Sequence, residues 1–176
     1  MLEKFVKVYN ETNFKAVADH IEKSDIYPAE WRDNLGNITG YQNLNVVIPK
    51  DRFIETVVND WVKKYINLYC NDFHFKLTSS TNPRFNKYDK SHSMDSHIDH
   101  IYSCFDGTQK GIPVLSVVGL LNDNFQGGKF VFEFEKDYTP SLLPGDIMIF
   151  PSAFPWKHRV EPVTEGTRYS WVSWVW

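Results

Sequence analysis

The residues with the clearest chemical potential in this chain are His97, Asp99, His158 and Arg168. Two imidazoles and one carboxylate form a ligand set that holds Fe(II) on one face of an octahedron and leaves the remaining positions for a cosubstrate and O2. A guanidinium is always charged and offers a planar fork to a carboxylate. Arg168 could therefore anchor the far carboxylate of 2-oxoglutarate while the near end chelates the metal. We predict a metal centre at His97, Asp99 and His158, with no catalytic residue beyond these ligands.

The His-Ile-Asp tripeptide at 97–99 is a weak signal by itself, because such tripeptides occur by chance, and a polar surface turn with incidental histidines is the alternative. On a strand, however, positions 97 and 99 point to the same face, so both side chains could reach one metal. His100 has the wrong strand parity to be a ligand, and His92 lies outside the matching pattern. Asp95 shares the parity of His97, so it is expected either to orient an imidazole or to be a solvated turn carboxylate.

Short apolar segments separated by Gly and Pro turns follow these residues. This pattern is typical of an antiparallel sandwich or jelly roll, so the predicted fold class is mainly β with supporting helices. The expected strands are residues 113–122, 129–135, 156–160 and 168–176, with a turn at 123–128. Within residues 142–150, Pro144-Gly145-Asp146 is expected to form a tight turn between short apolar runs.

Three segments carry a resemblance to a known family: LLNDNFQGGKFVF (120–132), LLPGDIMIFPS (142–152) and HRVEPVTEGTRYSWVSW (158–174). From about residue 84 to 176 the chain resembles the prolyl 4-hydroxylase type of Fe(II)/2-oxoglutarate-dependent oxygenases. The resemblance implies a double-stranded β-helix (jelly roll). It also implies that His97, Asp99 and His158 bind iron and that Arg168 binds the distal carboxylate of 2-oxoglutarate.

The resemblance also implies roles for Tyr88 and Trp174. Family members place a Tyr nine residues before the first metal ligand, in contact with the cosubstrate, and a Trp beside the iron pocket. This chain departs from the family pattern at Ser91, where Gly is common, and at Met94, where an aromatic residue is common. Ser170 lies two residues after the arginine, hence on the same strand face, and its hydroxyl could share the bound carboxylate.

These features predict a 2-oxoglutarate-dependent dioxygenase that hydroxylates an unactivated C–H bond and releases succinate and CO2. Its cofactors would be Fe(II), 2-oxoglutarate and O2, with ascorbate as a reductant. Prolyl 4-hydroxylation of a peptide or protein is the favoured reaction. Free proline or another small molecule is an alternative substrate, and a catalytically silent metal-binding jelly roll is an alternative of a different class. Related halogenases lack the carboxylate ligand, so Asp99 favours a hydroxylase.

Composition bounds the remaining possibilities. The 176 residues fit one domain, predicted to be a monomer, and the net charge of −3 without a basic stripe disfavours nucleic-acid binding. Oxygenases that demethylate nucleic-acid bases carry a second Arg where this chain has Trp174. The two cysteines, Cys70 and Cys104, lack metal or redox spacing, and no signal-like or membrane-spanning apolar run is present. A cytoplasmic protein without a membrane partner is expected.

The first half of the chain, residues 1–83, is predicted to supply supporting helices and loops plus a first strand, and residues 84–176 the catalytic motifs. Helical apolar spacing occurs at 13–23 and at 51–69, where Asp51 is a plausible N-cap. The segment 26–50 is too long for an ordinary connection. It is expected either to cap the substrate entrance or to form an ordered surface loop. Together with residues 101–111, it would form the walls of a peptide groove.

Overall fold

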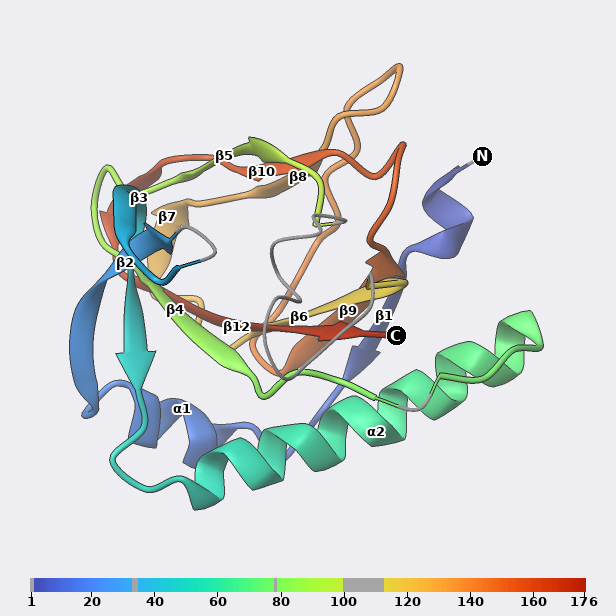
Figure 1. Ribbon diagram of the computed structural model, residues 1–176, viewed down its shortest axis with the longest axis horizontal. Helices are drawn as coiled ribbons and strands as arrows, with labels where there is room; N and C mark the ends of the chain where they lie inside the picture. Colours follow the sequence, from blue (N-terminus) through green and yellow to red (C-terminus); the bar gives the residue numbers. More distant parts are fainter. Residues whose placement is uncertain (1, 33–34, 78, 100–112) are drawn as a thin grey trace.

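The computed structural model describes residues 2–32, 35–77, 79–99 and 113–176, and it arranges them in layers (Figure 1). Two helices cover one face of a large sheet, and a smaller sheet lies over the opposite face. The elements in chain order are η1 (Leu2–Phe5), β1 (Lys7–Asn10), α1 (Lys15–Ile21), β2 (Asp25–Arg32), β3 (Ile38–Ile48), α2 (Phe53–Phe73), β4 (Arg84–Tyr88), β5 (Met94–His97), β6 (Leu115–Leu120), β7 (Phe125–Gly127), β8 (Phe130–Phe132), β9 (Asp146–Pro151), β10 (His158–Val160), β11 (Val163–Gly166) and β12 (Arg168–Val175).

The large sheet has seven strands in the order β1-β9-β6-β12-β4-β3-β2. A three-stranded sheet, β5-β10-β8, faces it, and β11 pairs with β7. All of the strand pairs named in the described residues are antiparallel. The predicted fold class, mainly β with a jelly-roll arrangement and supporting helices, is therefore confirmed.

Side-chain alternation divides the interior into two hydrophobic clusters. On β9, Ile147 and Ile149 pack in the cluster beneath α1 and α2, whereas Met148 and Phe150 point into the cluster between the two sheets. Strands buried on both faces have few polar positions, which is why β6 and β9 read as nearly continuous apolar runs. The large sheet thus packs against the two helices with one face and against the cluster between the sheets with the other.

The two predicted helices are present. Helix α2 buries a face spaced by three and four residues, which fits an amphipathic helix lying on a sheet: Val58, Trp61, Val62, Tyr65, Ile66 and Tyr69. The N-cap of α2 is Arg52, one residue later than predicted, and its side chain makes no capping hydrogen bond. The carboxylate of Asp51 accepts a hydrogen bond from the backbone N–H of Phe53 at 2.9 Å. Within the described residues, neither helix combines the length and the apolar character needed to cross a bilayer.

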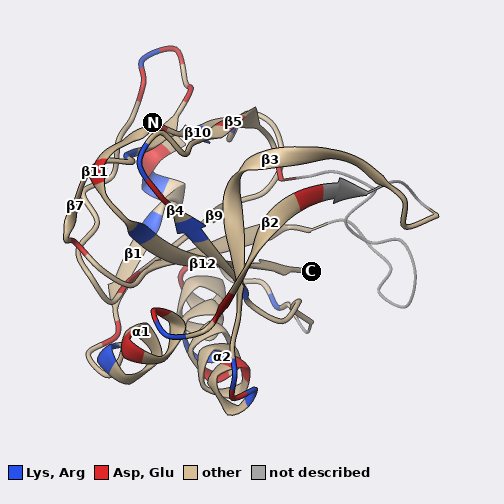
Figure 2. Ribbon diagram, turned by 90° about the vertical axis from the view of Figure 1, so that its left-hand side faces the viewer, with Lys and Arg blue, Asp and Glu red and all other residues tan. Residues whose placement is uncertain are grey.

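Residues 26–50 do not form the polar loop that the sequence suggested. They are largely a β-hairpin of β2 and β3, two long strands that run side by side and form one edge of the large sheet (Figure 2). Gly36 lies in the turn with a φ of 83°, a conformation that glycine adopts without strain. The expectation of a loop was wrong because an edge ribbon exposes many of its side chains to water, so polar residues do not exclude a strand.

The strand boundaries differ from the predictions in one further place. The turn expected at 123–128 contains the short strand β7, which pairs with β11. This difference reflects pairing with a distant segment, which local composition does not reveal. The apolar run after the turn expected at 144–146 is part of β9. Residues 101–111, the other predicted groove wall, lie outside the described residues, as do His100 and Cys104.

Gly119 allows the packing between strands β6 and β12 of the large sheet to be tested. A Cβ added at Gly119 would overlap the indole ring of the buried Trp171 on the neighbouring strand. We expect Gly119→Ala to lower the free energy of unfolding by about 1–3 kcal/mol, because the rigid ring has no room to move. Urea denaturation measures the change. Trp171→Phe in the same background removes the overlapping ring atoms, so the double variant should lose less than the sum of the two single variants. Simple additivity would contradict this account.

Candidate metal centre and cosubstrate pocket

Two separate segments bring the predicted metal ligands together between the two sheets. His97 is the last residue of β5, and His158 is the first residue of β10. The two residues are direct partners in the register of these antiparallel strands. Asp99 follows β5 by two residues, so it lies just past the strand rather than on it. The side chains of His97 and Asp99 do lie close together, as predicted, but a bend after the strand brings them together rather than strand alternation.

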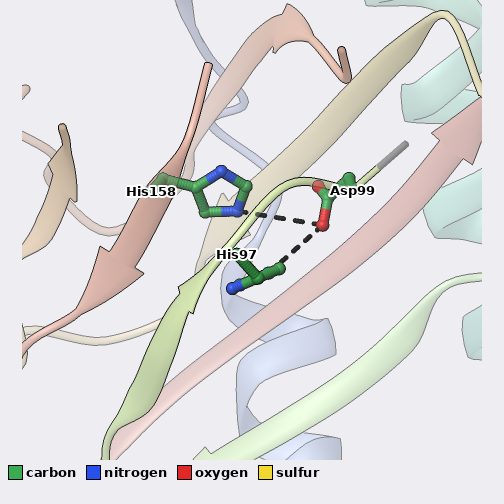
Figure 3. A group of neighbouring side chains, drawn as sticks. All are labelled: His97, Asp99 and His158. Atoms are coloured by element: carbon green, nitrogen blue, oxygen red, sulfur yellow. Dashed lines mark ion pairs between the residues drawn. The ribbon is translucent and has the colours of Figure 1, made fainter. Parts of the chain in front are cut away.

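The ligand atoms converge on a small volume (Figure 3). Asp99 Oδ1 lies 3.3 Å from His97 Nε2 and 3.8 Å from His158 Nε2. One ligand atom from each of the three residues lies within 4.8 Å of the others. Two ring nitrogens and a carboxylate oxygen at these separations form a donor set that suits a divalent transition metal.

The outer nitrogens of both rings are already used. His97 Nδ1 donates to the backbone carbonyl of Asp95 at 2.7 Å, and His158 Nδ1 donates to the backbone carbonyl of Trp156 at 3.0 Å. A carbonyl oxygen can only accept, so each Nδ1 carries a proton and each Nε2 directs a lone pair toward Asp99 when the ring is neutral. The backbone therefore sets the tautomer that metal binding requires.

The electrostatics of the cluster also suit a metal. Burial would raise the pKa of Asp99, but the hydrogen bond from His97, the nearby His158 and the hydrogen bond from Ser116 lower the pKa to about 2. Burial lowers the pKa of His158. Burial acts in the same direction on His97, yet the adjacent carboxylate of Asp99 raises its pKa overall. The site thus holds an ionised carboxylate and one imidazole that burial keeps neutral.

Neighbouring side chains lock these ligands in place. Ser116, fully buried on β6, donates to Asp99 Oδ2 at 2.6 Å and shares a 2.8 Å hydrogen bond with Ser152. The ring of Phe130 stacks on His158 with centroids 4.8 Å apart. Sequence analysis did not identify these supporting residues. The single polar residue within the apolar run of β6 was the available signal for Ser116.

The predicted cosubstrate residues lie together at the opposite end of the same pocket. Arg168 pairs with Tyr88 across strands β12 and β4, and its guanidinium carbon lies 5.1 Å from the centre of the Tyr88 ring. Its Nη1 donates to Ser170 Oγ at 2.8 Å. Arg168 is only 2% exposed, and burial lowers its pKa. No carboxylate in the described part of the chain pairs with this guanidinium, so the site contains a buried positive charge suited to an anionic ligand.

One cavity joins the metal cluster to Arg168. It encloses about 730 Å³ including the open solvent at its mouth. Trp174 lines this cavity, as predicted, and Gln42 of the β2–β3 hairpin contributes to its wall. Asn86 and Trp174 line the cavity, and the buried atoms Asn86 Oδ1 and Trp174 Nε1 have no hydrogen-bond partner among the described residues. A bound ligand would supply partners for them.

Among the described residues, the rival ligands His92 and Asp95 do not join the cluster. The side chain of His92 is used in a turn, where its Nδ1 accepts a hydrogen bond from the backbone N–H of Asp89 at 3.1 Å. The carboxylate of Asp95 is exposed, and it is the backbone carbonyl of this residue, not the carboxylate, that orients His97.

Ser116 supports a prediction that separates positioning from folding. Ser116→Ala removes the hydrogen bond that orients Asp99, so we expect Fe(II) affinity to fall by about 10–100-fold, as loss of such supporting contacts typically does. Anaerobic titration with Fe(II) measures the change. Ser173→Ala is the matched control, because Ser173 is equally buried but donates to the carbonyl of Thr81 on the other face of β12. Equal losses in the two variants would contradict a specific role for Ser116.

The site agrees with comparisons to known proteins. Residues 83–176 match the 2OG-Fe(II) oxygenase superfamily. A PKHD-type hydroxylase of Crocosphaera subtropica is 35% identical over 150 residues, which cover 84% of this chain and 64% of the relative. A PKHD-type hydroxylase of Delftia acidovorans is 34% identical over 99 residues, or 53% of this chain and 42% of the relative. The chain therefore spans less than two thirds of the length of these relatives.

Solved structures share the fold. One is a prolyl hydroxylase from Trichoplax adhaerens in complex with a peptide fragment of hypoxia inducible factor. The superposition has a TM-score of 0.72 at 15% sequence identity, and it includes 98% of this chain and 83% of the Trichoplax chain. A prolyl-4-hydroxylase from Pseudomonas putida superimposes with a TM-score of 0.68 at 16% sequence identity. This superposition includes 97% of this chain and 91% of the Pseudomonas chain. The resemblance inferred from the sequence motifs is thus confirmed, and because the family match covers the whole segment from β4 to β12, this chain belongs to the 2OG-Fe(II) oxygenase superfamily.

Proposed function

We propose that this protein is an Fe(II)- and 2-oxoglutarate-dependent hydroxylase. His97, Asp99 and His158 would hold the iron, and Arg168 would bind the distal carboxylate of 2-oxoglutarate. Asp99 would occupy the metal position that a halide ion takes in related halogenases, which lack this carboxylate. Its presence therefore favours hydroxylation. The proposed products are the hydroxylated substrate, succinate and CO2.

The observation that carries this proposal is the pairing of the metal cluster with Arg168 in one cavity. A jelly roll that merely stored a metal would have no use for a buried guanidinium at the other end of the cavity. A buried charge without a partner destabilises the fold, so its presence indicates a ligand that neutralises it. A dicarboxylate with one end on the metal and the other on Arg168 meets this requirement.

The protein residues have defined tasks in this scheme. When bound, iron and 2-oxoglutarate supply the oxidising chemistry, which lies beyond the reach of amino-acid side chains. Arg168 and Ser170 fix the far end of the cosubstrate, and Tyr88 closes the floor beneath the guanidinium. Apolar side chains exclude water around the site, among them Val118, Phe130 and Val160. Backbone carbonyls hold the Nδ1 protons of both ligand imidazoles, so Nε2 is the nitrogen of each ring that would bind the metal.

Prolyl groups of a peptide or protein are the proposed substrates. The names of structural neighbours, including prolyl hydroxylases and one with a bound peptide, support this choice. The β2–β3 hairpin, with Gln42 in the cavity wall, would form one side of a peptide groove. Free proline or another small molecule is the alternative substrate. A cytoplasmic location and a monomeric state are further parts of the proposal.

The function is tested by mass spectrometry. Purified protein is incubated with Fe(II), 2-oxoglutarate, ascorbate and either proline-containing peptides or free proline. A product heavier by one oxygen atom, formed together with succinate, is the expected result. His158→Ala removes one of three metal ligands and should abolish both products. Oxidation of free proline alone would favour the small-molecule substrate. Metal binding without succinate formation under any condition would favour the silent metal-binding module.

Arg168 can be tested by the concentration of 2-oxoglutarate that the protein requires. We expect Arg168→Ala to raise the apparent KM for 2-oxoglutarate by about 100-fold, since a charge-assisted contact to a carboxylate is lost. Arg168→Lys should be milder, because a point charge remains while the bidentate fork is lost. Succinate formation over a range of 2-oxoglutarate concentrations measures both. An unchanged requirement in Arg168→Ala would show that another cation anchors the cosubstrate.

A further inference from the structure

Asn86 brings a buried hydrogen-bond acceptor into the cavity, and the proposed cosubstrate site does not use it. This residue is the middle residue of β4, is 6% exposed and lines the cavity. Its Oδ1 is buried and has no hydrogen-bond partner among the described residues. A buried acceptor without a partner destabilises the fold, so its presence in a cavity indicates that a bound molecule donates to it.

The neighbouring hydroxyl groups do not satisfy this acceptor. Ser170 is the register partner of Asn86 on β12, and its Oγ accepts a hydrogen bond from Arg168 Nη1 at 2.8 Å. Tyr88 lies two residues further along β4 and lines the same cavity, with its ring beside Arg168. Neither hydroxyl makes a hydrogen bond to Asn86 Oδ1. The donor therefore has to come from a molecule that enters the cavity.

2-Oxoglutarate lacks the donor that Asn86 requires. Its two carboxylates are ionised at neutral pH, and carboxylate and ketone oxygens only accept hydrogen bonds. The amide nitrogen of Asn86 could donate to the cosubstrate, but the amide oxygen would still have no donor. The complementary group is therefore an N–H or an O–H of a molecule other than the cosubstrate.

The strand order places Asn86 on the flank of the cavity that faces the hairpin. In the large sheet, neighbouring strands follow the order β6-β12-β4-β3. Ser116 on β6 holds the metal ligand Asp99, and Arg168 lies on β12. Strand β4 lies beyond β12, about 10 Å across the sheet from β6. Its next neighbour is β3, which contributes Gln42 to the cavity wall. A cosubstrate that joins the metal to Arg168 therefore leaves the flank at Asn86 for the substrate.

A proline substrate offers an N–H group in one of two places. Proline within a peptide has no backbone N–H, so the N–H on its C-terminal side belongs to the residue that follows. Free proline at neutral pH carries two N–H groups on its ammonium. An amide N–H and an ammonium N–H both donate and do not accept, so each is complementary to a carbonyl oxygen. An N–H donor is thus common to both proposed substrates.

We propose that Asn86 Oδ1 accepts a hydrogen bond from an N–H group of the substrate. The donor is the backbone amide that follows the target proline or the ammonium of a free amino acid. The inference rests on the proposed hydroxylase function, and it makes Asn86 a residue that binds substrate rather than cosubstrate. A substrate whose N–H is replaced by N–CH3 leaves the acceptor unpaired and binds more weakly.

The test compares matched ligands with and without the N–H group by binding, without turnover. The protein is loaded with Mn(II) and 2-oxoglutarate under nitrogen. Isothermal titration calorimetry then measures the affinity for N-acetylproline methylamide and for N-acetylproline dimethylamide, which lacks the amide N–H. A second arm compares proline with N,N-dimethylproline, whose nitrogen carries no hydrogen. Wild-type protein should prefer the N–H ligand by about tenfold or more in at least one arm, and the responding arm identifies the donor.

Variants separate the hydrogen bond from the bulk of the added methyl group. Asn86→Leu has a similar size but no acceptor, so the preference should fall by about tenfold relative to wild type, leaving only the steric effect. Asn59→Leu is the matched control. Asn59 Oδ1 also lacks a hydrogen-bond partner among the described residues, but Asn59 lies on α2 and is not among the residues that line the cavity. This variant should keep the full preference.

Thermal melting of the ligand-free variants checks that Asn86 is unpaired before binding. Asn86→Leu should melt at the same temperature as wild type or higher, because it removes a buried acceptor that has no partner. Asn86→Ala is the second variant. Lower melting temperatures in both variants would show that the amide has a structural role, which would overturn the inference.

The remaining outcomes separate this inference from the proposed function. Equal affinities within both ligand pairs, binding of none of the ligands, or an unchanged preference in Asn86→Leu would overturn the role of Asn86. A lower affinity of Asn86→Leu for 2-oxoglutarate with an unchanged preference would assign the residue to the cosubstrate instead. With Fe(II) in air, equal kcat/KM for the N–H and N–CH3 ligands would support the hydroxylase and contradict the N–H site. A preference that depends on Asn86, without oxidation of any ligand, would support the N–H site and contradict the hydroxylase.

Discussion

Side chains on a β-strand point alternately to its two faces, and the large sheet of this protein depends on that alternation. On β12, Trp171 and Val175 pack beneath the helices, while Arg168 and Ser170 face the cavity. Because one strand supplies both the hydrophobic floor and the polar binding groups, a shift in its register by one residue would move the charged groups into the core and the core into the cavity. Packing and ligand binding therefore constrain the same register.

Burial shifts the pKa values of the polar groups in the cavity and separates their charges from water. At one end, Asp99 stays ionised because His97, His158 and Ser116 counteract the effect of burial on its pKa. At the other end, Arg168 has a hydroxyl and an aromatic ring as neighbours but no carboxylate among the described residues. Anionic and cationic groups are thus held apart at the two ends of one cavity, which is the arrangement that a metal-chelating dicarboxylate would complete.

The metal ligands owe their geometry to a backbone framework as much as to their own identity. The pairing of β5 with β10 sets the two histidines opposite each other, and backbone carbonyls hold both Nδ1 protons. Phe130 stacks on His158 and further limits its rotation. Ligands restrained in this way lose little conformational entropy when a metal binds. The hairpin of β2 and β3 contributes Gln42 to the wall of the cavity.

The sequence by itself predicted the chemistry proposed for the site: two histidines and Asp99 as a ligand set, Arg168 as the proposed anchor, and Ser170 and Trp174 on the same strand face as Arg168. These inferences depend on residue type and on a local period of two, both of which are visible in a linear chain. Only the tertiary structure decided that residues 26–50 form an edge hairpin and that Ser116 holds Asp99. Strand neighbours and cross-strand register arise from contacts between distant segments, and no local pattern specifies which segments meet.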